Sequence, residues 1–170
     1  MDWKLDSTTR NVRRALQAPD VVVNRPDIGT GPYAQCIYSC NRPGEIALTF
    51  EDGPLEYTRS VVEHLRGLKC TFFVMLDNEK ALAQVLDTMP TYMRRPFGSF
   101  SEELLKEIGN IGYHIAHWSS GTKDFEHDTE SQYRVSIKRF DKDLEAGGAV
   151  ALTHDTKFYT ANKLLPHMIA

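Results

Sequence analysis

The sequence lacks both a long hydrophobic run and a concentration of positive charge. A membrane-spanning helix needs about 20 consecutive apolar residues, and no stretch of this chain approaches that length. Lysine and arginine form no cluster and the formal net charge is -3, which argues against a nucleic-acid surface. We therefore expect no membrane span and no nucleic-acid partner, and we expect partners that are neutral or weakly charged.

An apolar signal segment is also missing. Met1 to Lys4 open a polar stretch without the apolar core of a signal peptide, so none is predicted. The chain would then be either a trimmed mature form or a protein that stays inside the cell.

Cysteine is scarce. The three cysteines, Cys36, Cys40 and Cys70, leave at least one thiol unpaired, which disfavours a small secreted domain held by disulfides. Cys36 and Cys40 also lack the C-x-x-C spacing of a redox or zinc pair.

The composition fits one compact domain. The chain has 170 residues, of which 41% are hydrophobic, and this is enough to bury one sizeable core. Residues 1–44 are interrupted by residues that disfavour regular elements, namely Pro19, Pro26, Gly29, Gly31, Pro32 and Pro43. We predict an irregular N-terminal extension over 1–44 and a single domain over 45–170.

From residue 45 onward, short apolar runs alternate with helical patterns. The runs predict neighbouring strands at 47–50, 71–74, 115–118 and 150–152. Strands that alternate with helices are typical of a parallel sheet in an α/β fold. Capping-box patterns, from Ser99 to Glu102 and from Thr129 to Gln132, predict the starts of two helices.

The segment Thr-Phe-Glu-Asp-Gly-Pro at 49–54 ends the first of these runs with two adjacent carboxylates. Such a pair suits metal binding by one carboxylate and proton abstraction by the other, because repulsion and a bound cation separate their pKa values. The alternative is a solvated acidic turn in which Asp-Gly-Pro ends the strand.

Polar residues follow three of the apolar runs, at Glu51-Asp52, at 119–124 and at His154-Asp155. In parallel α/β folds, functional groups collect at the C-terminal ends of the strands. The three segments are therefore expected at one rim, although any soluble strand must also meet polar loop residues somewhere.

Four motifs occur in an order that resembles a known family. After 49–54, residues 92–99 contain Arg-Arg-Pro-Phe-Gly, 118–125 resemble an Asp-x-x-Asp-Trp region, and 152–154 read Leu-Thr-His. From about Cys40 to the C-terminus, the chain resembles the polysaccharide deacetylases, the NodB-homology domain of carbohydrate esterase family four, and in particular its fungal chitin-deacetylase-like members.

The resemblance implies a distorted parallel (β/α) barrel. It also implies a hydrolase that removes acetyl groups from a chitin-like or related polysaccharide with the help of zinc or another divalent metal. The family is mostly extracellular or bound to the cell wall.

The resemblance assigns the first group of roles to the metal and the base. Asp52 matches the aspartate that binds the metal, and Glu51 matches the catalytic base. Glu51 is one methylene longer than the usual aspartate, and a displacement of about one ångström can cost ~10²-fold in rate. Arg94 matches the arginine that orients the base.

The remaining roles concern the leaving group and the acetyl group. His154 matches the general acid that protonates the leaving amine, and Asp124 matches the aspartate that orients it. Phe97 stands where the family has a tyrosine whose backbone amide helps to hold the oxyanion, and Phe125 and Leu152 match the apolar wall around the acetyl methyl.

The family's His-(Ser/Thr)-x-x-His motif, which supplies two zinc-binding histidines, is not found in the sequence. It should follow the strand at 71–74, but the chain continues into a helical pattern at 79–86. We therefore predict that about one strand-helix unit, ~30 residues, is missing, and that the barrel is incomplete. His114 and His117 should point to opposite faces of a strand, so His127 is the better substitute ligand.

Two functions remain open. The chain is either a polysaccharide deacetylase, impaired by its incomplete metal site, or an inactive carbohydrate-binding or scaffold pseudoenzyme. A third explanation is a splicing or gene-prediction error in a gene for a complete enzyme.

Overall fold

The computed structural model describes residues 31–73, 89–95, 98 and 100–170. Its larger sheet has four parallel strands in the order β3-β2-β7-β6. These strands are Ala47–Glu51 (β2), Thr71–Phe73 (β3), Ser120–Gly121 (β6) and Val150–His154 (β7). The central pair, β2 and β7, is aligned so that Glu51 lies opposite His154 at the ends of the two strands.

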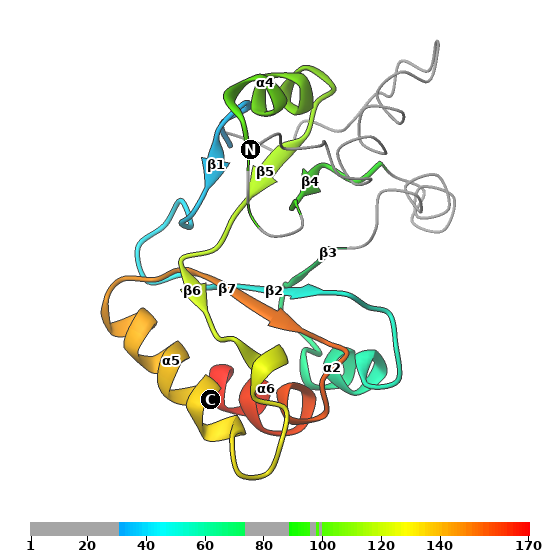
Figure 1. The fold of residues 1–170 in the computed structure, drawn as a ribbon, viewed down its shortest axis with the longest axis vertical. Helices are drawn as coiled ribbons and strands as arrows, with labels where there is room; N and C mark the ends of the chain where they lie inside the picture. Colours follow the sequence, from blue (N-terminus) through cyan, green and yellow to red (C-terminus); the bar gives the residue numbers. More distant parts are fainter. Residues whose placement is uncertain (1–30, 74–88, 96–97, 99) are drawn as a thin grey trace, which may run out of the picture.

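A second, smaller sheet has three parallel strands in the order β1-β5-β4. They are Cys36–Ile37 (β1), Tyr92–Met93 (β4) and His114–Ala116 (β5). This sheet lies beside the larger one, at the top of Figure 1, together with helix α4 (Glu102–Asn110).

The other helical elements belong to the larger sheet. They are α2 (Thr58–His64), the 3-10 turn η3 (Asp124–Glu126), α5 (Tyr133–Glu145), the π-helical turn η4 (Thr160–Leu164) and α6 (Leu165–Met168). In Figure 1, α2, α5 and α6 lie on the lower side of β2 and β7. No helix in the described part of the chain is long and apolar enough to cross a membrane.

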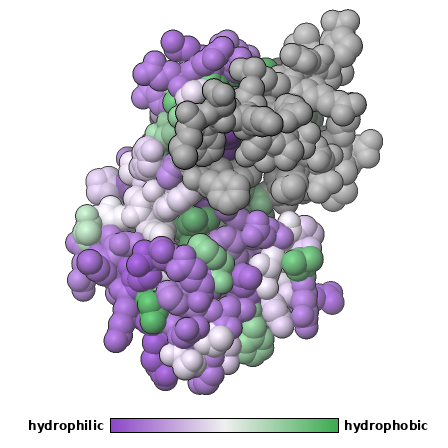
Figure 2. Space-filling view, in the orientation of Figure 1, coloured by the Kyte–Doolittle hydropathy of each residue, from purple (hydrophilic) through white to green (hydrophobic). Residues whose placement is uncertain are grey.

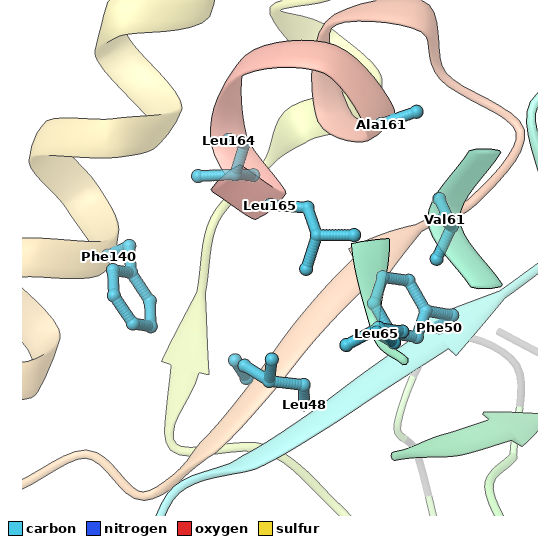
Figure 3. Packing of buried hydrophobic residues seen from close by; sticks show 9 residues of the cluster. Leu48, Phe50, Val61, Leu65, Phe140, Ala161, Leu164 and Leu165 are labelled. Atoms are coloured by element: carbon cyan, nitrogen blue, oxygen red, sulfur yellow. The ribbon is translucent and has the colours of Figure 1, made fainter. Parts of the chain in front are cut away.

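Each sheet has its own hydrophobic cluster. Under the larger sheet, side chains from β2, β7, α2, α5 and the C-terminal turns pack together (Figure 3), among them Leu48, Phe50, Val61, Phe140 and Leu165. A second cluster joins α4 to the smaller sheet through Met93, Leu104, Ile108, Tyr113 and Ile115. On the face shown in Figure 2, the described surface is mostly hydrophilic and its hydrophobic residues form small patches.

The predicted parallel α/β architecture is confirmed, but one strand is placed differently. The expected strands at 47–50 and 150–152 are neighbours, as are 47–50 and 71–73, while residue 74 lies outside the described residues. The expected strand at 115–118 was wrongly placed beside them, because β5 ends at Ala116 and pairs within the smaller sheet.

The chain changes sheets at Ser119. Its backbone N–H donates to the carbonyl of Val150 at 3.0 Å, and its hydroxyl accepts from the N–H groups of Ala149 and Val150 at 2.9 and 3.1 Å. These bonds attach the following residues to β7, so that β6 takes the position expected for residues 115–118. The pairing depends on residues about 30 positions apart, which a local pattern does not reveal.

Two local expectations also change. Within the predicted irregular extension, Cys36–Ile37 forms a strand that pairs with β5; the domain boundary at residue 44 stays a prediction. Helix α4 is capped by Ser101, whose side chain accepts from the N–H of Leu104 at 3.2 Å, rather than by Ser99.

All three cysteines are free thiols.

Adjacent valines in α2 allow a matched test of the larger cluster. Val61 is fully buried in it, whereas Val62 is 51% exposed. We expect Val61→Ala to lower the free energy of unfolding by about 2 kcal/mol, because it removes buried methyl groups and leaves a cavity. Val62→Ala should change it by less than about 0.5 kcal/mol. Urea denaturation measures both, and equal effects would contradict the packing described here.

Candidate functional site

The candidate site lies at the C-terminal ends of β2 and β7. Because these strands are parallel and in register, Glu51 and His154 end neighbouring strands at the same edge of the sheet (Figure 1). Asp52 follows directly with a φ of 68°, a left-handed conformation that aspartate tolerates better than most residues. The structure therefore brings together three of the residues expected at the rim.

Arg94 connects this rim to the smaller sheet. It follows β4, and its side chain is 1% exposed. Nη1 donates to the hydroxyl of Thr49 at 2.7 Å and to Glu51 Oε1 at 3.2 Å. Nε and Nη2 donate to the carbonyls of Ala116 and His117 at 3.1 and 2.8 Å.

The same guanidinium lies over the ring of Phe73, with its central carbon 4.3 Å from the ring centroid. A buried guanidinium is tolerated when its donors are satisfied and its charge is paired. Glu51 supplies the charge, so Arg94 holds the Glu51 carboxylate in one orientation.

Two opposing effects determine the pKa of Glu51. Burial raises the pKa of Glu51, and the charge and hydrogen bond of Arg94 offset part of that rise. The result is a carboxylate with a pKa above its ordinary value, hence a stronger base than an exposed glutamate.

His154 and Asp124 form a buried acid-base pair. Asp124 Oδ1 lies 2.8 Å from His154 Nδ1, and Asp124 Oδ2 accepts the backbone N–H of His154 at 2.7 Å. Because a carboxylate only accepts hydrogen bonds, Nδ1 carries the proton and Nε2 is left to face the rim. One aspartate thus fixes both the ring and the backbone of His154.

Two threonines that the sequence reading did not single out hold Asp124 in place. The Thr122 hydroxyl shares its one hydrogen between the Leu152 carbonyl at 2.8 Å and Asp124 Oδ1 at 3.2 Å, and Thr160 donates to Asp124 Oδ2 at 2.7 Å. Thr160 comes from η4, 36 residues further along the chain. Only the position of Thr122, two residues before Asp124, offered a local signal.

The charge balance at His154 favours its protonated form. Burial would lower the pKa of His154, but the hydrogen bond and charge of Asp124, together with the charges of Asp52 and Glu51, outweigh that effect. The pKa of His154 is therefore raised above 6.5.

Asp52 is the most open member of the site. Its side chain is 71% exposed, and its Oδ2 lies 3.9 Å from His154 Nε2, which is too far for a direct hydrogen bond. The carboxylate is therefore accessible to a ligand from solvent.

The described residues do not fit a catalytic zinc site. Such a site takes three protein ligands and an open position, and no three His, Cys, Asp or Glu side chains in 31–73, 89–95, 98 and 100–170 are arranged to hold a metal ion. The ion pair that Asp52 makes is with His154, at 3.9 Å.

The other histidines lie in different surroundings. His114 is 1% exposed and stacks on Tyr33 at 4.2 Å between ring centroids, within the smaller sheet. His117 stacks on Trp118 at 4.0 Å, and its Nε2 lies 3.2 Å from the carbonyl of Gly98. His127, the substitute ligand we considered, has a buried Nδ1 without a hydrogen-bond partner among the described residues.

Two of the three expected substrate-binding residues are described. The Phe125 ring is 50% exposed and meets His154 edge-on, 5.2 Å between centroids. Leu152 lies in β7 between Thr49 of β2 and Gly121 of β6. Phe97 lies outside the described residues.

No family model matches the chain, but individual proteins do. A chitin deacetylase of Arthroderma benhamiae is 29% identical, covering 85% of this chain and 52% of its own length. A chitin deacetylase of Pestalotiopsis sp. is 28% identical, covering 81% and 62%. This chain spans about half the length of the curated relatives it matches.

The alignment with the Arthroderma benhamiae protein has 193 positions, more than the 170 residues of this chain. That relative therefore contains residues without a counterpart here.

The chain also resembles solved structures in its fold. The chitin deacetylase of Colletotrichum lindemuthianum matches with a TM-score of 0.75 at 23% identity, covering 81% of this chain and 85% of that one. A carbohydrate esterase family four pseudoenzyme from Bacillus anthracis matches with a TM-score of 0.66 at 17% identity, covering 81% and 64%. The predicted fold, an incomplete parallel (β/α) barrel, is confirmed.

The raised pKa of His154 leads to a pH-dependent contribution to stability. The protonated form is favoured by folding, so its contribution is fully present below pH 6.5 and is lost as the pH rises through the higher folded-state pKa. We expect an NMR titration of the His154 ring to give a pKa above 6.5.

The variant Asp124→Asn should lower that pKa, because it removes the carboxylate charge while burial remains. Asp141→Asn, at a carboxylate that pairs with His167 elsewhere on the surface, is the matched control and should leave it unchanged. A His154 pKa unaffected by Asp124→Asn would refute the described pair.

Proposed function

We propose that this chain, a member of the polysaccharide deacetylase family, binds N-acetylated polysaccharide at the rim formed by β2 and β7 and has at most slow deacetylase activity. The proposal is supported by two hydrogen-bonded pairs of side chains that lie at the same rim. Glu51 is held by Arg94 and His154 by Asp124, and register places Glu51 beside His154.

The two pairs suit the hydrolysis of an amide. Glu51 would accept a proton from a water that attacks the acetyl carbonyl, and its raised pKa favours that role. Protonated His154 would donate a proton to the departing amine when the carbon–nitrogen bond breaks, giving acetate and a free amino group. Arg94 and Asp124 are positioning residues for this chemistry.

The proposed substrate is a chitin-like polymer. Three similar proteins named above are chitin deacetylases, and a further one from Arthroderma benhamiae is described as a probable peptidoglycan-N-acetylglucosamine deacetylase. An N-acetylglucosamine unit is common to these substrates. Phe125 and Leu152 would contact its acetyl methyl.

The metal is the reason to expect low activity. Family membership calls for a divalent cation, and Asp52 is the residue proposed to bind it. One exposed carboxylate leaves most of the coordination sphere to water, so zinc or another divalent ion should bind weakly. Little lowering of the pKa of a bound water is then expected.

The small number of metal ligands among the described residues favours a second candidate function. An inactive carbohydrate-binding protein would keep the rim and its aromatic side chain without needing three metal ligands. A pseudoenzyme is also among the proteins with the same fold. The two candidates differ in acetate release but share the binding of an acetylated oligosaccharide.

Acetate release from N-acetylglucosamine oligomers in the presence of zinc tests the proposed function. We expect slow release or none, and weak zinc binding by calorimetry. Any release should be lost in His154→Ala, which removes the proton donor. Tight stoichiometric zinc binding with fast release, abolished by both Asp52→Ala and His154→Ala, would show that other ligands complete the metal site.

Oligosaccharide binding is measured in parallel by calorimetry. We expect Phe125→Ala to weaken binding about tenfold, equivalent to ~1.4 kcal/mol, because it removes the exposed ring beside His154. Val62→Ala, on the exposed face of α2, is the control and should bind as the parent does. Absence of binding by the parent protein would contradict both candidate functions.

A further inference from the structure

Asp155 is a buried carboxylate that the proposed chemistry does not use. It follows His154 directly after β7 and is 0% exposed. Its Oδ2 accepts a hydrogen bond from the hydroxyl of Thr58, while Oδ1 has no hydrogen-bond partner among the described residues. Burying a carboxylate with one unpaired oxygen is unfavourable, so some other feature of the fold must require it.

Thr58 connects Asp155 to the segment after β2. The Thr58 hydroxyl accepts the backbone N–H of Leu55 at 2.8 Å and donates to Asp155. Thr58 is also the first residue of α2. A continuous set of hydrogen bonds therefore runs from the turn that follows Asp52, through the start of α2, to the end of β7.

Gly53 brings the same turn into direct contact with Asp155. A Cβ atom at Gly53 would collide with the Asp155 carboxyl group, whose Cγ and Oδ1 would each lie only 2.6 Å away. The backbone of the turn is thus packed against the carboxylate, and any larger residue at position 53 would force the Asp155 carboxyl group to move. Asp52 is the residue immediately before this contact.

We propose that Asp155 is a positioning residue, which fixes the turn after β2 through Gly53 and Thr58 and so sets the direction of the Asp52 carboxylate toward His154. Asp52 has a left-handed backbone conformation, and its side chain is 71% exposed. Among the described residues, its carboxylate has no hydrogen-bond partner that would orient it. The packing of Gly53 against Asp155 supplies the restraint. The restraint matters for catalysis only if the proposed function is correct. The restraint itself does not depend on that function.

The test measures coupling between Asp52 and His154 in the ligand-free protein. At pH 5, where the imidazole is protonated, Asp52→Asn should displace the ¹⁵Nε2 resonance of His154. In an Asp155→Ala background the same substitution should displace it at least about threefold less, because the two sites are coupled through the turn. Asp155→Asn keeps an acceptor oxygen for Thr58 and should preserve most of the displacement.

Asp143→Ala is the matched control. Asp143 accepts the backbone N–H of Gly121 at 3.0 Å in β6, so its loss tests the general effect of removing a structural aspartate. It should leave the Asp52–His154 coupling unchanged even if it lowers the melting temperature.

An undiminished displacement in Asp155→Ala would overturn the proposal. If that variant does not fold, Thr58→Val, which removes the hydroxyl and keeps the shape, provides the same comparison with the same two outcomes. The result is independent of acetate release and oligosaccharide binding, so the proposed function can fail while this inference stands.

Discussion

The buried guanidinium of Arg94 is the interaction on which the arrangement of the site depends. It donates to a hydroxyl and a carboxylate on β2 and to the carbonyl groups of Ala116, the last residue of β5, and of His117, which follows it. A positive charge removed from water is stable only while these acceptors stay in place. Arg94 therefore links the two sheets to each other and to the Glu51 carboxylate.

His154, the proposed proton donor, is held by a carboxylate instead of a cation. Asp124 accepts hydrogen bonds from the ring and backbone of His154 and from two threonines. The base is therefore fixed by a cation and the acid by an anion, and each partner favours the charged state of the group it holds. Glu51 and His154 are also electrostatically attracted to each other, so the rim holds opposite charges at the ends of neighbouring strands.

Much of this site could be predicted from local sequence. The segment at 49–54 indicated where β2 ends, and the polar residues at 119–124 and at His154-Asp155 were expected at the same rim because they follow apolar runs. The pairing of Asp124 with His154 was expected only from the family resemblance. Thr122 and Thr160 were missed, since their hydroxyls matter only once η3, β7 and η4 are assembled. The placement of β5 failed for a similar reason: Ser119 moves the chain between sheets through bonds to residues about 30 positions away.

The separation of the hydrophobic side chains into two clusters has a consequence for the motions of the molecule. One cluster supports β2 and β7, and the other supports β5 and α4. Cooperative opening follows contiguous packed units, so we expect the amide protons of the two sheets to exchange with two local free energies of opening rather than one. A local opening confined to the smaller sheet would release the carbonyl partners of Arg94 while the strands that end at Glu51 and His154 stay folded.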